Sequence, residues 1–114
     1  MNGEKNIPDE PMKNFDSAHV LSQPKRLGIM ITLVSNERIT FGELQKILDI
    51  TPGNLDSHLK KLESAKYVKI KKAFVGKTPR TIVAITDEGY YSTMLYISKL
   101  KRIFETVTDR RRLR

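Results

Sequence analysis

The spacing of the apolar residues changes twice along this sequence, near residue 66 and again near residue 86. Leu55, Leu59 and Leu62 follow one another at gaps of four and three positions, which places them on one face of an α-helix. From there to about residue 86, apolar residues alternate with lysine and threonine, a pattern typical of half-buried β-strands. Helical spacing then returns. The sequence therefore predicts a fold that is mainly α with a small β-hairpin (α+β).

Three helices are predicted before the hairpin. The first begins at Pro24, with Ser22 near its cap, because proline suits the first turn of a helix, and it ends at Ser35-Asn36. The apolar face of this helix consists of Leu27, Met30, Ile31 and Val34, widened by Ile29 and Leu33. A short helical turn ahead of it, capped by Asp16 or Ser17, is expected to bring Ala18, Val20 and Leu21 into apolar contact.

The second and third helices carry strong start signals. Thr40 and Glu43 fit a capping box at the start of the second helix, whose predicted buried stripe is Leu44, Ile47 and Leu48. Asp49-Ile50 forms a tight turn, after which Thr51 caps the third helix and Pro52 occupies its first position. The face of the third helix opposite its leucines presents Asn54, Ser57, Lys60, Lys61 and Ser64. Two helices joined in this way form a helix-turn-helix pattern.

A hairpin is predicted to follow the third helix. Its first strand has Val68 and Ile70 alternating with lysines, and its second strand has Thr81, Val83 and Ile85 in the same alternation. The intervening residues, Val75-Gly76-Lys77-Thr78-Pro79, contain glycine and proline and are predicted to form the tip. Two strands with a basic tip after a helix-turn-helix form a wing.

A long final helix is predicted to start at Thr86, whose hydroxyl caps it ahead of Asp87 and Glu88. It carries an apolar stripe that Thr93 interrupts and that Tyr91 and Leu95 broaden. A helix of about twenty residues that projects from a small domain suits a coiled-coil-like dimer contact; the alternative is that it folds back onto the core of its own domain. The predicted dimerisation residues are Tyr90, Met94, Ile97, Leu100, Phe104 and Val107.

The chain divides into four predicted segments: a flexible N-terminal arm (1–15), a winged helix-turn-helix domain (16–86), a dimerisation helix (87–109) and a basic tail (110–114). The longest apolar-rich run, residues 27–34, is far shorter than the roughly 20 residues that a membrane span needs. The segment before residue 14 is polar and lacks the apolar stretch of a secretion signal. A cytoplasmic location is therefore expected.

Charge favours a polyanionic partner. The 114 residues carry a net charge of +8, and residues 66–86 contain lysines and arginine but no Asp or Glu. A second basic cluster ends the sequence: Arg110, Arg111, Arg112 and Arg114. This cluster is either a further contact for an anionic partner or a solvated terminus.

The residue inventory argues against catalysis. The chain has no cysteine, which excludes disulfides, thiol chemistry and thiolate metal sites. His19 and His58 lie far apart and form no metal-binding motif, and there is no acid pair, nucleophile elbow or phosphate loop. We therefore expect no enzymatic activity, no cofactor and no metal.

The order helix, helix, helix, strand, wing, strand, long helix resembles the winged helix-turn-helix transcriptional regulators of the MarR and ArsR superfamily, including their small archaeal and bacterial dimeric members. The resemblance covers about residues 21–104. The strings that carry it are Pro24-Lys25-Arg26-Leu27, Thr40-Phe41-Gly42-Glu43-Leu44, Ser57-His58-Leu59-Lys60-Lys61-Leu62-Glu63, Gly76-Lys77-Thr78-Pro79-Arg80-Thr81 and Ile85-Thr86-Asp87-Glu88-Gly89. Metal-sensing members use cysteines or histidine–acid clusters, which this chain lacks.

The predicted function is sequence-specific binding of double-stranded DNA as a homodimer, with the helix at about 52–65 in the major groove and the wing at about 67–86 on the flanking backbone or minor groove. The resemblance implies the same placement. Asp56 is expected to pair with Lys60, although it could instead accept from a cytosine or face away. The predicted DNA-binding residues are Thr51, Asn54, Ser57, His58, Lys60, Lys61, Lys71, Lys72, Lys77, Thr78 and Arg80.

Two other functions remain open at this point. A winged-helix module can serve protein–protein contacts in a transcription or other assembly, which would favour an apolar or acidic outer face on the third helix. The basic wing and tail would also suit a sequence-blind architectural DNA binder. The operator, the sign of regulation and any small-molecule effector are not indicated by the sequence.

Overall fold

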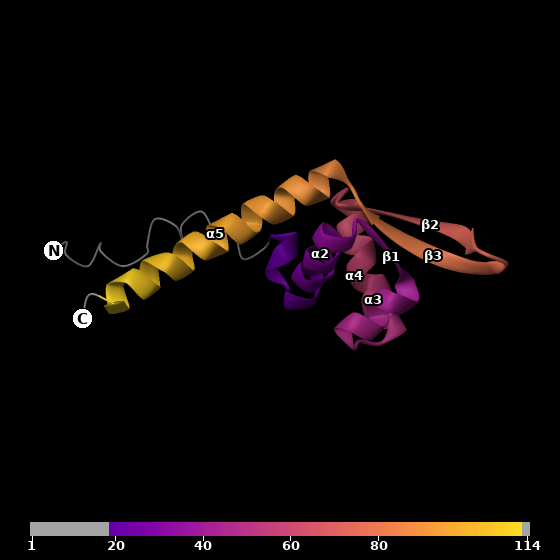
Figure 1. The fold of residues 1–114 in the computed structure, drawn as a ribbon, viewed down its shortest axis with the longest axis horizontal. Coiled ribbons are helices and arrows are strands. Elements are labelled where there is room, and N and C mark those ends of the chain that lie inside the picture. The colour runs from indigo at the N-terminus through magenta and orange to yellow at the C-terminus, as the bar shows by residue number, and fades with distance from the viewer. Residues whose placement is uncertain (1–18, 113–114) are drawn as a thin grey trace.

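The structure, a computed structural model, describes residues 19–112, and side chains through Asp109. A short 3-10 turn, η2 (Val20–Ser22), precedes α2 (Pro24–Asn36), β1 (Arg38–Thr40), α3 (Phe41–Leu48) and α4 (Pro52–Ser64). The hairpin of β2 (Val68–Val75) and β3 (Thr78–Ile85) follows, and α5 (Asp87–Arg112) ends the described chain. Figure 1 shows the hairpin extending from one end of the α2–α4 cluster and α5 running away toward the other end. The mainly α fold with a β wing is confirmed.

The helix starts follow local capping chemistry. The capping box of α3 is present, with Glu43 N–H donating to Thr40 Oγ1 (3.1 Å) and the Glu43 carboxylate accepting from Thr40 N–H (3.3 Å). Asn54 N–H donates to Thr51 Oγ1 (3.2 Å) at the start of α4. The N-cap of α2 is Gln23, the residue after Ser22, which was expected near the cap. The Gln23 side chain accepts from the backbone N–H groups of the first turn, which a glutamine is long enough to reach.

The wing belongs to a sheet of three antiparallel strands in the order β1-β3-β2. Strand β1 was not predicted: it pairs Arg38 with Ala84 and Thr40 with Ile82, and its three residues are too few to show an alternation. The tip is also tighter than predicted. Val75 pairs directly with Thr78, and a turn of Gly76 and Lys77 joins the strands, with Gly76 at the positive φ of 65° that glycine tolerates.

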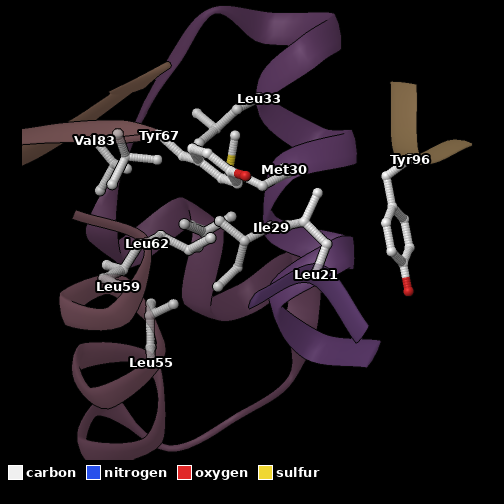
Figure 2. Packing of buried hydrophobic residues seen from close by; sticks show 12 residues of the cluster. Leu21, Ile29, Met30, Leu33, Leu55, Leu59, Leu62, Tyr67, Val83 and Tyr96 are labelled. Carbon is white, nitrogen blue, oxygen red and sulfur yellow. The ribbon is translucent and has the colours of Figure 1, made fainter. Parts of the chain in front are cut away.

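The core lies where α2, α4, the base of the sheet and the first half of α5 meet (Figure 2). Its buried apolar residues are Leu21, Ile29, Met30, Leu33, Leu44, Leu55, Leu59, Leu62, Tyr67, Val68, Val83 and Tyr96. The prediction that Ile31 and Ile47 are buried is wrong, because their side chains are 45% and 57% exposed. Both are absent from the residues that form the core or pack against it.

The first half of α5 packs on its own domain. Gly89, Thr93 and Tyr96 are buried on this side of the helix, and Leu100 is half-buried against the core. Leu100, predicted as a dimer contact, therefore contributes to the core of its own domain. From residue 101 to residue 109 no side chain is buried, and the molecule reaches 66 Å along its longest axis against 25 and 24 Å across.

At the joint between the wing and α5, which we define as Thr86, hydrogen bonds connect the start of α5 to the segment that follows α4. Thr86 Oγ1 accepts from Gly89 N–H (2.9 Å), which confirms Thr86 as the cap, and donates to the Lys66 carbonyl (2.6 Å). Thr86 N–H donates to the Tyr67 carbonyl (3.0 Å). The start of α5 is thus bonded to the chain segment that directly follows α4.

Three sequence expectations fall outside the described residues: the arm of residues 1–15, the contribution of residues 16–18 to a first helical turn, and the side chains of the basic tail. The helix α5 itself continues through Arg112, beyond its predicted end at 109.

Candidate nucleic-acid interface

Helix α4 separates its side chains into two opposite faces. Leu55, Leu59 and Leu62 are fully or almost fully buried, because the spacing of four and three keeps them on the side that faces the core. The outer face is exposed and contains Asn54, Ser57, Lys60, Lys61 and Ser64. The structure therefore brings together the polar residues predicted on this helix and leaves them accessible.

Asp56 and Lys60 form an ion pair one helical turn apart. The Lys60 Nζ lies 3.3 Å from an Asp56 carboxylate oxygen, and both side chains are mostly exposed. The predicted pairing is confirmed. Because exposed pairs of this kind contribute at most about 1 kcal/mol, Lys60 can exchange this partner for a phosphate at low cost.

The N-terminus of α4 has hydrogen-bond donors available. Thr51 Oγ1 accepts a backbone N–H, and a hydroxyl that accepts one bond still has its own proton to donate. Thr51, Pro52 and Gly53 are exposed, and a Cβ added at Gly53 would meet no atom within 4 Å. An anion can approach this helix end closely.

The surroundings of His58 favour its neutral form and one tautomer of its ring. It is half-buried, and its Nδ1 lies 3.3 Å from an Nη1 of Arg26. Arginine can only donate, so Nδ1 accepts and the ring proton is on Nε2. Burial lowers the pKa of His58 from its ordinary value of 6.5, and the charge of Arg26 lowers it further. The neutral ring is thus favoured, and it offers an N–H donor at its Nε2.

Sequence reasoning missed the role of Arg26. Its Nε donates to the Val20 carbonyl (2.6 Å) while its Nη1 contacts His58, so one side chain on α2 connects η2 to α4. Lys25 acts in a similar way, because its Nζ donates to the Leu48 carbonyl at the end of α3 (2.9 Å). Both residues lie in the string Pro24-Lys25-Arg26-Leu27, but nothing local indicates which carbonyls they reach.

The wing carries its cations on two faces. Lys71, Lys72, Lys77 and Arg80 are all exposed, as is Thr78. Lys71 lies opposite Ile82 and Lys72 lies opposite Thr81 in the ladder, and since neighbouring residues of a strand point to opposite faces, these two lysines point apart. Arg80 shares the face of Lys71. A duplex against one face of the hairpin meets one of these two lysines directly.

Arg80 also acts near the start of α3. The pKa of Glu43 lies below its ordinary value of 4.5, chiefly because Thr40 donates hydrogen bonds to the carboxylate, and the positive charge of Arg80 lowers it further. Arg80, on β3 of the wing, is thus close enough to the start of α3 for its charge to act on Glu43.

Two cavities flank the joint between the wing and α5, of about 540 Å³ and 620 Å³. The smaller lies between the end of α2, the sheet and α5, and the larger lies along the outer edge of β2. Val34, Glu37, Arg38, Ala84, Ile85, Thr86, Asp87 and Tyr90 line the first. Within residues 19–112 there is no group of three or more histidine and acidic side chains that could hold a metal ion. No helix in the described part of the chain is long and apolar enough to cross a membrane.

Comparison with known proteins places this geometry in a family. An uncharacterized protein of Methanocaldococcus jannaschii is 33% identical over 82 residues, which cover 72% of this chain and 89% of that protein. The structure of a transcriptional regulator homologue from Pyrococcus horikoshii OT3 is similar, with 42% identity and a TM-score of 0.81, over 86% of this chain and 97% of that chain.

More distant structures share the fold. MepR, a transcription regulator of a Staphylococcus aureus multidrug efflux pump, superposes with a TM-score of 0.65 at 15% identity, over 94% of this chain and 73% of that chain. The predicted resemblance to winged helix transcriptional regulators is confirmed. Residues 25–104, from the start of α2 into the second half of α5, match the family described as winged helix DNA-binding domain. The chain belongs to the winged helix DNA-binding domain family.

Proposed function

We propose that this chain is a sequence-specific regulator of transcription that binds double-stranded DNA as a homodimer. The observation that carries the proposal is the division of α4 into a buried leucine face and an exposed polar and basic face. A protein-docking helix would present an apolar or acidic outer face instead. The hairpin that follows α4 carries five lysine and arginine residues between Val68 and Ile85 and no acid.

On this proposal α4 enters the major groove. Asn54 and Ser57 on its outer face donate to and accept from base edges, and His58 donates through Nε2. Lys61, and Lys60 after release from Asp56, reach phosphates or a guanine edge. The Thr51 hydroxyl and the Gly53 N–H, the first N–H of the helix because Pro52 has none, bind a phosphate, favoured by the positive end of the helix dipole.

The hairpin lies along the flanking backbone or the minor groove. Lys77 at the turn, Thr78 beside it, Arg80 and one of the pair Lys71 and Lys72 supply phosphate contacts. These contacts add affinity and fix the orientation of the protein, while sequence preference comes from α4.

Dimerisation through α5 completes the proposal. Phe104 and Val107 extend the apolar stripe of the helix beyond the domain and are 74% and 48% exposed. Tyr90, Met94 and the half-buried Ile97 lie on the adjacent side of the same helix. Packing against the α5 of a second copy would bury this stripe. Two copies so joined present two α4 helices to half-sites about one helical turn, or about 34 Å, apart.

The test is selection of duplexes from a random DNA pool with the full chain, followed by titration of the selected duplex and a scrambled one at two salt concentrations. We expect a two-fold symmetric selected site and binding to it that is at least about 10³-fold tighter than to the scrambled duplex. Ser57→Ala should change the selected sequence at one position in each half-site. A Ser64→Ala variant, altered on the same face at the far end of α4, is the matched control and should select the original site.

Equal affinity for the two duplexes would show a sequence-blind binder and overturn the specific readout. An absence of binding to either duplex would overturn the DNA function altogether and favour the protein-interaction module. An unchanged selection with Ser57→Ala would mean that direct readout does not involve Ser57.

A further inference from the structure

The tip of the wing carries two apolar side chains that phosphate contacts leave unexplained. Phe74 is 74% exposed and Val75 is 55% exposed, at the end of β2 next to the turn. Phe74 pairs with Pro79 across the ladder, and Val75 pairs with Thr78. Because successive residues of a strand point to opposite faces, Phe74 and Val75 stand on opposite sides of the hairpin.

Phe74 stands on the side of the sheet that covers the core. Directly opposed residues of an antiparallel pair share a face, so the pairs Ile70–Val83 and Phe74–Pro79 lie on one face, four positions apart. Val83 is buried in the core, whereas Phe74 lies about 13 Å further along the strand, beyond the packed part of the domain. The aromatic ring therefore projects from the end of the hairpin, outside the core.

The charged residues of the hairpin near this ring are all positive. Lys72 shares the face of Phe74 two residues before it, Lys77 lies in the turn, and Arg80 stands next to Pro79 on the opposite face. A surface that receives the tip must accept an aromatic ring and also neutralise several cations. The minor groove of a duplex does both, because phosphates line it and the stacked bases at its floor can accept an inserted apolar side chain.

We propose that Phe74 is a wedge that enters the minor groove beside the site bound by α4 and partly unstacks one base step. The wedge rests on the proposed DNA-binding function and adds that the protein bends its site, by at least about 20° toward the major groove. The bend makes flexible steps such as TA or CA at the wing position favourable. Phe74 would thus determine part of the sequence preference without a hydrogen bond to any base.

Val75 provides a matched control within the same tip. It is apolar and exposed like Phe74 but stands on the other face, so its truncation changes the hydrophobicity of the tip and not the wedge. Since both side chains lie outside the core, Phe74→Ala and Val75→Ala should have the melting temperature of the unmodified protein.

The experiment uses the duplex selected from the random pool, with 2-aminopurine placed in turn at each position flanking the half-site. Binding is followed by fluorescence anisotropy of an end label, and unstacking by the emission of the 2-aminopurine. In the saturated complex of the unmodified chain, emission should rise at least twofold at one step. Phe74→Ala should abolish this rise while it still binds, Phe74→Trp should restore it, and Val75→Ala should leave it unchanged.

The outcomes separate the wedge from the DNA function itself. Tight binding without a rise at any position, or a rise that persists in Phe74→Ala or is lost in Val75→Ala, overturns the wedge and leaves the regulator intact. Failure to bind any duplex overturns both. If sedimentation shows that Phe74→Ala changes the oligomeric state of the free protein, the tip is a contact between copies and the wedge is overturned.

Discussion

On the side of α5 that faces the domain, Thr93 buries a hydroxyl oxygen with no hydrogen-bond partner among the described residues. Leaving a buried polar group unpaired costs about 1–3 kcal/mol. Thr93→Val keeps the shape and replaces the hydroxyl by a methyl group, so we expect it to raise the free energy of unfolding by about 1 kcal/mol in urea denaturation.

Thr32→Val is the control for this change. The Thr32 hydroxyl donates to the Gly28 carbonyl (2.8 Å), so its removal forfeits a hydrogen bond and should give no gain in stability. A Thr93→Val variant less stable than the unmodified protein would mean that the hydroxyl is paired in solution.

His58 should make stability depend on pH. Its pKa is lowered in the folded state, so below the ordinary value of 6.5 the unfolded chain binds more protons than the folded one. Stability contributed by neutral His58 is therefore complete above that value and declines as the pH falls through the lowered pKa. We expect the urea midpoint to fall between about pH 7.5 and 5.5, and to fall less in His58→Asn, whose amide oxygen can still accept from Arg26.

The lowered pKa of Glu43 makes stability depend on pH in a more acidic range than that of His58. Its contribution is present above the ordinary value of 4.5 and is lost only as the pH falls further. A Glu43→Gln variant should therefore keep the His58 transition. If the urea midpoint of His58→Asn falls as much between about pH 7.5 and 5.5 as that of the unmodified protein, a group other than His58 causes the fall.

At the scale of single residues, the sequence predicts local capping contacts but not contacts between residues on different elements. Thr40, Thr51 and Thr86 act within three residues of themselves, and all three were identified. Gln23 was missed because glutamine is not a preferred cap residue. Arg26 was missed because its partners lie on η2 and α4, and only the packing of α2 brings them within reach.

At the scale of elements, periodicity predicts which residues form a helix or strand but not what covers them. Helices α2, α3 and α4 and the two wing strands have the predicted order because each contains its own apolar repeat. Strand β1 exists because β3 offers it a partner 42 to 46 positions further along the sequence. The apolar stripe of α5 does not tell whether a second copy or the same domain covers it: Leu100, a predicted dimer contact, packs on its own chain, as does Tyr96, which lies outside the predicted stripe.

Gly89 fixes how closely α5 approaches the start of β2. A Cβ at this position would collide with the backbone of Tyr67, which cannot move aside as a flexible side chain can. We expect Gly89→Ala to lower the free energy of unfolding by about 1–3 kcal/mol. Gly42→Ala, where a Cβ meets nothing within 4 Å, should instead raise it by up to about 1 kcal/mol because alanine is the better helix former. Equal effects would show that α5 is not seated as described.

Lys77 tests the wing as an element of the interface. Because a phosphate contact is independent of sequence, Lys77→Ala should weaken binding to selected and scrambled duplexes alike. The slope of log affinity against log salt concentration should fall in magnitude by about one contact, or roughly 0.9. Lys99→Ala, exposed on α5 away from the wing, should leave the slope unchanged. An unchanged slope with Lys77→Ala would remove the turn from the interface.

At the scale of the whole molecule, the described chain is elongated rather than globular. A chain of this length packed into one globule has a radius of gyration of about 13 Å, whereas this one has 17.6 Å. The excess comes from α5, whose 26 residues span about 39 Å and outrun the domain they start on. The joint at Thr86 ties this helix to the end of α4, so pairing of two α5 helices would also set the distance between two recognition helices.

Phe104 is the residue on which this arrangement can be tested. It is 74% exposed, on the part of α5 that no other described element covers (Figure 1). Placing a carboxylate in an apolar contact costs more than 1.4 kcal/mol, so Phe104→Glu should raise the Kd of the dimer at least about tenfold, as measured by sedimentation equilibrium. Arg102→Glu puts the same charge on the opposite side of the helix and should leave the Kd within a few-fold. If the unmodified chain is monomeric at micromolar concentration, or if both variants dissociate equally, the apolar stripe of α5 is not the dimer contact and the spacing of half-sites must be set by another surface.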